Sequence, residues 1–420
     1  MTHSFNRMTT IAALDIGSTK VSCVIAKVGR DKRINVVGYG YNASKGIKNG
    51  IITNIDDATL AVCNAVETAE QMANERIERV IVNISGDKVK SVIKDATITL
   101  NKNRPVNETD LKKVVEKGMY KVNTEGCELI HCLSGNYRLD GGEEMKDPRN
   151  IFGETLSVNI LLGLVPDIMY RNVQTIIENA HLEVAGSAFS AYASGLACLV
   201  DDERELGATV IDMGGGTTSI ACFRHGYPIY FSSLPVGGSN VTNDIAYGLT
   251  TSIPHAERLK TLYGCAFLSS QDQEEAINVY QVGEEDDSLI KQINRADLIK
   301  IISPRIEETF EMVNRKLAEV GLQDVSSHRV VLTGGASQLV GVGKMASMVL
   351  DKQVRLGRPK NILNLPDSLY NPAFSTCIGL LLFALNYNEK KPSKIINKPL
   401  SGVSAGGMGR IWNWLKIIFD

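Results

Sequence analysis

The sequence predicts an α/β protein built from two similar lobes, with a small α+β unit inserted into the first lobe. Segments 11–25 and 209–223 share one pattern, in which a β-rich run ends in an aspartate, a glycine turn with hydroxyl residues follows, and a second β-rich run completes a hairpin. A third strand follows each hairpin. The two aspartates, Asp15 and Asp212, lie 197 residues apart, far beyond the period of a solenoid repeat. We therefore infer a duplicated lobe.

The composition excludes several classes of protein. Hydrophobic residues make up 44% and charged residues 22% of the 420 residues, as in an ordinary globular protein. The 45 basic and 47 acidic side chains leave a net charge of −2, so we expect no nucleic-acid partner. The eight cysteines show no CxxC spacing, which indicates reduced cysteines rather than a zinc site or a disulfide framework. Neither a signal peptide nor a run of 18 apolar residues occurs, so we expect a protein that is not exported and does not span a bilayer.

We expect the first lobe to occupy residues 9–85 and to resume at 166–200, where a helix rich in small residues should connect it to the second lobe. Pro166 should open a helix, because proline is favoured at the first helical position. In chain order, the expected elements after the hairpin are a strand at 34–39, a helix at 56–79, a strand at 80–84, the helix opened by Pro166, a strand at 182–186 and the connector helix at 188–199.

Residues 86–165 differ from the rest of this lobe, because strand patterns surround a single helical stretch there. We interpret them as an inserted α+β subdomain. Its expected elements are strands at 89–100, 129–137 and 155–165 and a helix at 108–122.

Residues 201–386 should form the second lobe, with a smaller subdomain inserted at about 240–320. We interpret the acidic run 201–205 as a solvated loop. Pro304 should kink a long helix at 295–320, because proline removes a backbone hydrogen bond. The other expected elements are helices at 239–249 and 254–263, a strand at 329–332 and a last buried helix at 374–385.

The chain changes character after residue 386. Residues 387–407 are rich in Lys, Pro, Ser, Gly and Asn and predict a flexible linker. Residues 408–420 have the pattern of an amphipathic helix that contains both tryptophans of the protein, and tryptophan favours the bilayer interface. Residues 388–420 carry six basic and two acidic side chains, or +4, which suits an anionic membrane surface. The membrane-facing residues should be Ile411, Trp412, Trp414, Leu415, Ile418 and Phe419.

The alternative for this segment is a helix that docks back onto the body of the protein. The composition of the preceding linker argues against fixed packing of that kind.

The glycine turns are the best candidates in the sequence for a phosphate-binding site. Glycines let backbone N–H groups approach phosphate oxygens, hydroxyls add donors, and a carboxylate can hold Mg²⁺ through water. Either turn alone is also typical of an ordinary hairpin. Two such turns on equivalent lobes favour a clamp around a triphosphate, and a third turn at 333–336, after a buried strand, has room for a purine or ribose.

These motifs resemble the five-part pattern of the actin and heat-shock chaperone ATPase superfamily. Within it, the chain resembles the FtsA family of bacterial cell-division proteins, through Leu-Asp-Ile-Gly-Ser-Thr-Lys at 14–20, Val-Leu-Thr-Gly-Gly-Ala at 331–336, the position of the insertion and the tail helix. The resemblance implies an actin-like fold of two ribonuclease-H-like lobes, with the insertion as subdomain 1C. It also implies that Asp15 and Asp212 hold Mg²⁺ through water. The implied ATP-binding residues are Asp15, Gly17, Ser18, Thr19, Lys20, Asp212, Gly214, Gly215, Gly216, Thr217, Thr218, Gly237, Glu257, Lys260, Gly334, Gly335 and Ala336.

No catalytic residue is assigned. The hydrolysing relatives place a glutamate just before the first connector helix, and alignment puts Gly186 at that place. We therefore expect at most slow ATP hydrolysis. The rival interpretations are a true ATPase or small-molecule kinase on the same fold, and a related scaffold for pilus assembly.

The resemblance also implies partners. We expect the chain to bind the C-terminal peptide of FtsZ through Arg305 and Glu308, which on other grounds would be an ordinary solvated pair. It should polymerise with itself and bind other division proteins through subdomain 1C. The expected place is the cytoplasmic face of the bacterial inner membrane at the septum, where the protein would anchor the FtsZ ring.

Overall fold

The computed structural model describes residues 9–120, 122, 124–269, 275–282, 290–323, 329–360, 362 and 365–389. The predicted membrane helix and most of the predicted linker lie outside these residues. In the described part of the chain, no helix combines the length and the apolar character that crossing a membrane requires.

The first lobe is a five-stranded sheet in the order β11-β6-β1-β2-β3, in which β1 pairs antiparallel with β2 and parallel with β6. Most side chains of β1 and β2 are buried, because helices cover the sheet. The strands are β1 (Thr9–Ile16), β2 (Lys20–Val28), β3 (Ile34–Ala43), β6 (Arg79–Ile84) and β11 (Glu183–Phe189), and the helices are α1 (Ile55–Ala73), α3 (Asp167–Asn179) and α4 (Ser190–Cys198). A short hairpin of β4 (Ile47–Lys48) and β5 (Ile51–Ile52) lies between β3 and α1.

The second lobe repeats this topology. Its sheet has the order β14-β13-β12-β17-β18, so that a hairpin again begins the lobe and two parallel strands extend the sheet beyond its first strand. This match confirms the predicted duplication. The elements are α5 (Asp201–Leu206), β12 (Ala208–Met213), β13 (Thr218–Arg224), β14 (Tyr227–Leu234), α6 (Gly238–Leu249), α7 (Ile253–Tyr263), β15 (Ala276–Val279), β16 (Lys291–Asn294), α8 (Arg295–Glu319), β17 (Arg329–Thr333), α9 (Val342–Leu350), β18 (Gln353–Leu356) and α10 (Ser375–Glu389).

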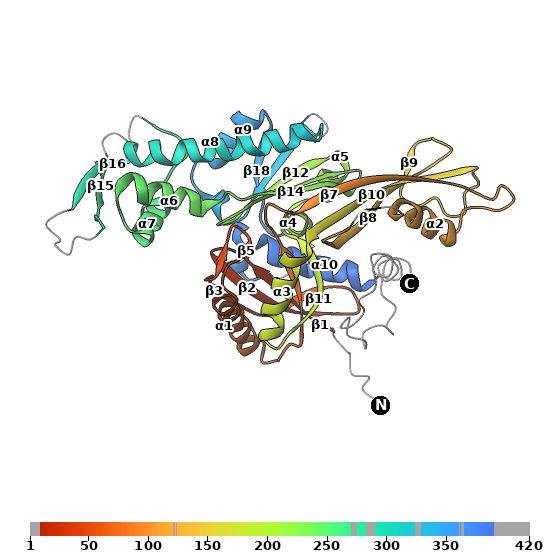
Figure 1. Ribbon diagram of the computed structural model, residues 1–420, viewed down its shortest axis with the longest axis horizontal. Helices are drawn as coiled ribbons and strands as arrows, with labels where there is room; N and C mark the ends of the chain where they lie inside the picture. The colour runs from red at the N-terminus through yellow and green to blue at the C-terminus, as the bar shows by residue number, and fades with distance from the viewer. Residues whose placement is uncertain are drawn as a thin grey trace.

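The insertion has a sheet and a core of its own. Its strands follow the order β7-β10-β8-β9, and one face packs against α2 around Val114, Leu156 and Ile160. Figure 1 shows the insertion extending to the right of the two lobes, while α6, α7 and the β15–β16 hairpin extend to the left. The elements are β7 (Lys90–Thr99), α2 (Glu108–Met119), β8 (Cys127–Leu139), β9 (Glu144–Met145) and β10 (Thr155–Pro166).

The two connector helices, α4 and α10, cross at very close range. A Cβ atom on Gly379 of α10 would lie 1.8 Å from the carbonyl oxygen of Ala193 on α4, so only glycine fits at this crossing. The side chains of α4 and of residues 375–385 in α10 are almost entirely buried. The crossing forms part of the continuous core that joins the first lobe to the second.

The structure corrects the expectations for residues 201–206, for Pro166 and for the end of the last helix. Residues 201–206 form the helix α5 rather than a loop, because the buried carboxylate of Glu203 pairs with the Arg355 guanidinium of β18. The expected long helix forms as α8, which continues through Pro304 as one element. Its flanking residues Ile302 and Ile306 are both buried, so packing holds the helix on either side of the proline. Pro166 ends β10 and caps α3, one position before the helix begins, and α10 extends to Glu389, into the predicted linker.

Candidate functional site

The two glycine turns that follow β1 and β12 face each other and touch. A Cβ atom on Gly215 would lie 2.3 Å from Cγ2 of Thr19, and one on Gly216 would lie 2.6 Å from Oγ of Ser18. Larger residues at these glycines would push the turns apart. Glycine is therefore required at these positions because the two hairpins approach each other closely. The tight turn within each hairpin is a second reason for glycine.

A polar cavity, which we call the phosphate cavity, lies between these turns. Both turns, the end of β6, the start of α4 and the segment before α10 supply its walls. Its lining residues are Asp15, Gly17, Ser18, Thr19, Lys20, Asn83, Ser85, Ser190, Asp212, Gly214, Gly215, Gly216, Thr217, Ser219, Gly334, Gly335, Pro372, Ala373 and Thr376.

Both connector helices hold Asp212 in place. Its Oδ2 accepts hydrogen bonds from Ser194 Oγ of α4 at 2.5 Å and from Thr376 Oγ1 of α10 at 2.8 Å. Burial raises the pKa of Asp212, and these two hydrogen bonds oppose the rise. The position of the Asp212 carboxylate therefore depends on the positions of both connector helices.

Asp15 and Lys20 set the electrostatics of the first turn. Burial raises the pKa of Asp15 to about 7, Lys20 lowers it, and Asp212 raises it further. Lys20 Nζ donates to the carbonyl of Ala373 at 2.9 Å and lies 3.4 Å from the ring centroid of Phe374, and burial lowers its pKa. A cation bound beside these two carboxyl groups would oppose the rise of both pKa values and favour the ionised forms.

A second cavity of about 420 Å³, which we call the adenosine cavity, adjoins the first. The two share Thr19, Gly215 and Gly335 among their lining residues. Lys260 Nζ on α7 donates to Glu257 Oε2 at 2.7 Å and to Thr242 Oγ1 at 2.8 Å, so the predicted pair forms and faces this cavity. The rest of its lining includes Gly237, Gly238, Ser239, Ala336, Gln338 and Val340.

The third glycine turn lies between the two cavities. Gly334 has φ +85°, and a Cβ atom there would lie 2.3 Å from Oδ1 of Asp212. Both its backbone conformation and its close approach to Asp212 thus require glycine.

The structure brings together all but one of the residues expected to bind ATP. The exception is Thr218, which is fully buried in β13 and donates its hydroxyl hydrogen to the carbonyl of Val236. Asn83 and Ser190, which sequence reasoning missed, line the phosphate cavity. Gly186, the position aligned with the catalytic glutamate of the hydrolysing relatives, lies within β11 and does not line this cavity, whereas Ser190 at the start of α4 does.

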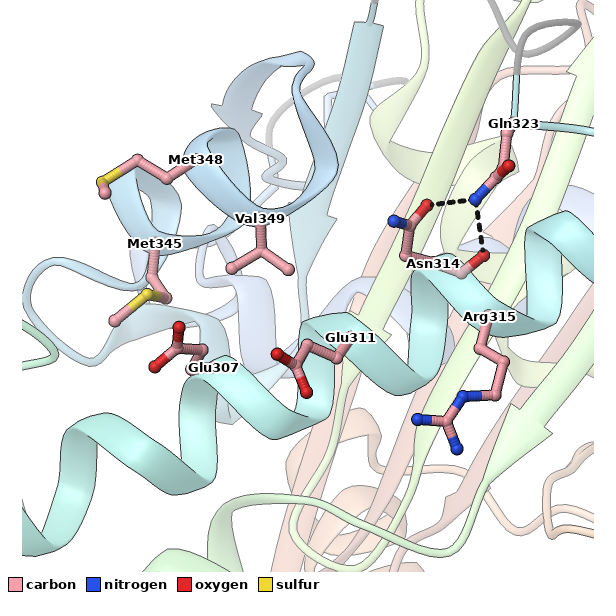
Figure 2. Close-up of a pocket in the computed structure, with 8 residues that line it drawn as sticks. All are labelled: Glu307, Glu311, Asn314, Arg315, Gln323, Met345, Met348 and Val349. Carbon is pink, nitrogen blue, oxygen red and sulfur yellow. Dashed lines mark hydrogen bonds between the residues drawn. The ribbon is translucent and has the colours of Figure 1, made fainter.

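Arg305 and Glu308 lie on the side of α8 that faces α6. Arg305 Nε donates to Asp244 Oδ2 of α6 at 2.6 Å, and its Nη1 pairs with Glu308. A separate groove of about 520 Å³ lies between α8 and α9, with Glu307 and Glu311 opposite Met345 and Met348 (Figure 2). Arg305 and Glu308 are not part of its lining.

The part of the chain that the structure describes contains no group of three or more His, Cys, Asp or Glu side chains able to hold a metal ion on their own. A cation bound near Asp15 and Asp212 would therefore need water or ligand oxygens to complete its coordination.

The fold and the paired glycine turns define an actin-like protein. The structure is similar to a solved "PilM-PilN type IV pilus biogenesis complex", with a TM-score of 0.61, 16% identity and coverage of 89% of this chain and 98% of that chain. It is also similar to MreB5 of Spiroplasma citri bound to ADP, with a TM-score of 0.55, 12% identity and coverage of 91% and 99%. These likenesses show the fold.

Sequence comparison identifies the family within this class. The family model "Cell division protein FtsA" matches residues 209–379, and "SHS2 domain inserted in FTSA" matches residues 86–162. Cell division protein FtsA of Agrobacterium fabrum is 36% identical over 99% of this chain and 96% of its own length. That of Rhizobium meliloti is 39% identical over 89% and 86%, and that of Escherichia coli K12 is 29% identical over 97% and 97%. The chain belongs to the FtsA family and is an actin-like cell-division protein.

Proposed function

We propose that this protein is an ATP-binding adaptor that anchors the FtsZ ring to the cytoplasmic face of the inner membrane at the division septum. The observation that supports it most directly is the convergence of three glycine turns, from both lobes, on two adjoining cavities. The phosphates of ATP would lie between the first two turns, and the adenosine would lie beside Glu257 and Lys260. The nucleotide would thus contact both lobes and bridge them at this cleft.

Magnesium fits the same cavity. Asp15 and Asp212 supply two carboxylates from opposite lobes, and the absence of a third acidic or histidine ligand in the described residues suits an ion that keeps several waters and binds phosphate oxygens. The ion would neutralise part of the triphosphate charge. Lys20, on the edge of the cavity, would add a positive charge beside the phosphates.

Binding of a fluorescent ATP analogue to the full chain tests the site. Asp212→Ala should weaken binding by removing an oxygen that holds Mg²⁺-bound water. Gly215→Asp should weaken it more, because its side chain would meet Thr19 and place a carboxylate against the phosphates. Gly343→Ala, on α9 with its nearest neighbouring atom 4.0 Å away, is the matched control and should bind as the parent does. Equal binding by all four proteins would contradict the assignment.

We expect ATP hydrolysis to be slow, below roughly 0.1 s⁻¹ against an enzyme median of about 10 s⁻¹. The carboxylates that line the phosphate cavity are those of Asp15 and Asp212, which are assigned to the cation, and the residue at the start of α4 is Ser190. A steady-state phosphate-release assay measures the rate. Turnover of several per second would favour the rival interpretation as a true ATPase.

The C-terminal peptide of FtsZ would bind at α8, through Arg305 and Glu308. Because Arg305 already pairs with Asp244, the peptide would bind beside this ion-pair cluster or exchange partners with it. Arg305→Glu should weaken peptide binding measured by fluorescence anisotropy. Lys300→Glu reverses the charge of an exposed cation on the same helix and serves as the control. Equal binding by Arg305→Glu, Glu308→Lys and the parent would remove both residues from the site.

Residues 408–420 would carry the membrane anchor. Self-polymerisation would align many anchors along one filament, and subdomain 1C would offer a surface to other division proteins. The proposal thus assigns a separate part of the chain to each partner.

A further inference from the structure

A histidine of the insertion lies where the insertion, both lobes and both connector helices meet. His131 on β8 is fully buried, and its ring lies 5.1 Å from those of Phe189 and Tyr192, centroid to centroid. The rings of Phe231 on β14 and Phe383 on α10 lie at 5.8 and 5.6 Å. Aromatic packing alone would explain a ring at this position.

The imidazole nitrogens of His131 indicate a hydrogen-bonding role in addition to aromatic packing. His131 Nε2 accepts a hydrogen bond from the backbone N–H of Phe189 at 3.1 Å. Burial lowers the pKa of His131 to about 3, so the ring is neutral and its proton belongs on Nδ1. Within the described structure Nδ1 has no hydrogen-bond partner, and a buried donor without a partner destabilises the fold. A phenylalanine would avoid this cost but could not accept the Phe189 hydrogen bond.

That hydrogen bond holds the junction between β11 and α4, next to the phosphate cavity. The following residue is Ser190, whose Oγ accepts from Asn83 Nδ2 at 3.1 Å. Asn83 Oδ1 in turn accepts from the backbone N–H of Ile16 at 2.7 Å, directly after Asp15. One turn further along α4, Ser194 donates to Asp212. The start of α4 is therefore bonded to the first phosphate turn through Ser190 and Asn83, and to the second through Ser194.

The insertion is also fixed to the second lobe. Ser91 Oγ on β7 donates to the carbonyl of Phe231 at 2.8 Å and accepts from its N–H at 3.1 Å. Phe231 is one of the rings around His131. A displacement of the insertion relative to β14 would thus act on the imidazole and on the strand–helix junction that it holds.

We propose that His131 is a positioning residue that couples the insertion to the nucleotide site, by holding the start of α4 where Ser190, Asn83 and Ser194 orient both phosphate turns. A partner that binds the insertion would change nucleotide affinity through this contact, and by linkage the nucleotide would change affinity for the partner. The inference rests on the proposed nucleotide function for its ligand. The contacts themselves do not depend on it.

The test compares variants of the full chain. His131→Phe keeps the aromatic packing and removes the acceptor, whereas His131→Gln places an amide oxygen near the position of Nε2. We expect His131→Phe to weaken ATP-analogue binding by about fivefold or more, with partial rescue in His131→Gln. Tyr192→Phe, in the same aromatic cluster, and Cys132→Ala, in the core of the insertion, control for packing and for lost stability, and both should bind as the parent does.

Hydrogen exchange without nucleotide gives a readout that is independent of ATP. His131→Phe should speed exchange in the peptide that contains Ile16 and Gly17, and Cys132→Ala should not. The proposal would be overturned if His131→Phe exchanged hydrogen and bound the ATP analogue as the parent does. It would also be overturned if the loss of nucleotide affinity in the four variants simply tracked their loss of thermal stability. If the parent itself bound no ATP, the proposed function would fail, and faster exchange at Ile16 in His131→Phe alone would still support the coupling.

Discussion

At the scale of single residues, the largely buried carboxyl of Asp15 has the clearest energetic consequence. Its pKa in the folded protein is raised from 3.8 to about 7, chiefly by burial. Between these values the folded state holds a proton that the unfolded state releases. The stabilising effect of this proton is therefore fully present below about pH 4 and is lost as the pH rises to about 7.

We predict that Asp15→Asn unfolds at a higher urea concentration than the parent at pH 8 and gains much less at pH 5. A full shift of this size corresponds to about 4 kcal/mol, and the partial exposure of Asp15 should reduce the gain to a fraction of that. Asp87→Asn, which changes an exposed aspartate, is the control. The same pH dependence in the parent and in Asp15→Asn would contradict the prediction.

At the scale of elements, the α4–α10 crossing decides how the lobes are joined. A glycine in a helix interior normally destabilises by about 0.5–1 kcal/mol relative to alanine. At Gly379 the alanine methyl would lie 1.8 Å from the carbonyl oxygen of Ala193, a backbone atom that cannot move without shifting α4. Steric overlap must therefore outweigh helix propensity here.

We predict that Gly379→Ala lowers the free energy of unfolding by about 1–3 kcal/mol or more. Gly343→Ala, in the open environment of α9, should leave it unchanged or raise it by up to about 1 kcal/mol. Urea titration followed by circular dichroism measures both. Two variants with the same sign of effect would show that the crossing is not tight.

At the scale of the whole molecule, the strength of membrane attachment should depend on polymerisation. Six bulky apolar side chains, each worth about 1.5–3 kcal/mol when fully buried, give at most some 9–18 kcal/mol. Partial burial at the interface reduces this gain, and ordering the helix costs about 1–2 kcal/mol per residue, so the two terms are of similar size and a single anchor should bind weakly. Neighbouring anchors on a filament would then raise the overall avidity without new contacts.

We predict weak binding of the monomer and tight binding of the polymer to anionic vesicles. Trp412→Glu combined with Trp414→Glu should abolish both while ATP-analogue binding remains, and the Trp412→Phe, Trp414→Phe pair is the matched control. Vesicle flotation measures the bound fraction. Undiminished binding after removal of residues 408–420 would place the membrane site elsewhere on the chain.

Features that depend on neighbouring residues could be predicted from the sequence alone. Both glycine-turn hairpins, the turn at Gly334 and the contact between Glu257 and Lys260 occur in the structure where the sequence predicts them, because turn chemistry and helical spacing act over a few residues. The repeated sheet order of the lobes followed from the repeated hairpin pattern. The amphipathic pattern of residues 408–420 is equally a property of the sequence by itself.

Only the tertiary structure decided the features that depend on distant partners. Residues 201–206 are helical because Glu203 meets Arg355, and Arg305 pairs with Asp244 across two helices. Asn83 and Ser190 enter the site because β6 ends and α4 begins beside the first hairpin. Thr218 lies outside it because its hydroxyl donates a hydrogen bond to the carbonyl of Val236 inside the lobe. The role of each of these residues depends on a contact with a residue far away in the chain or on the direction in which its side chain leaves the strand. A local sequence pattern encodes neither of these two properties.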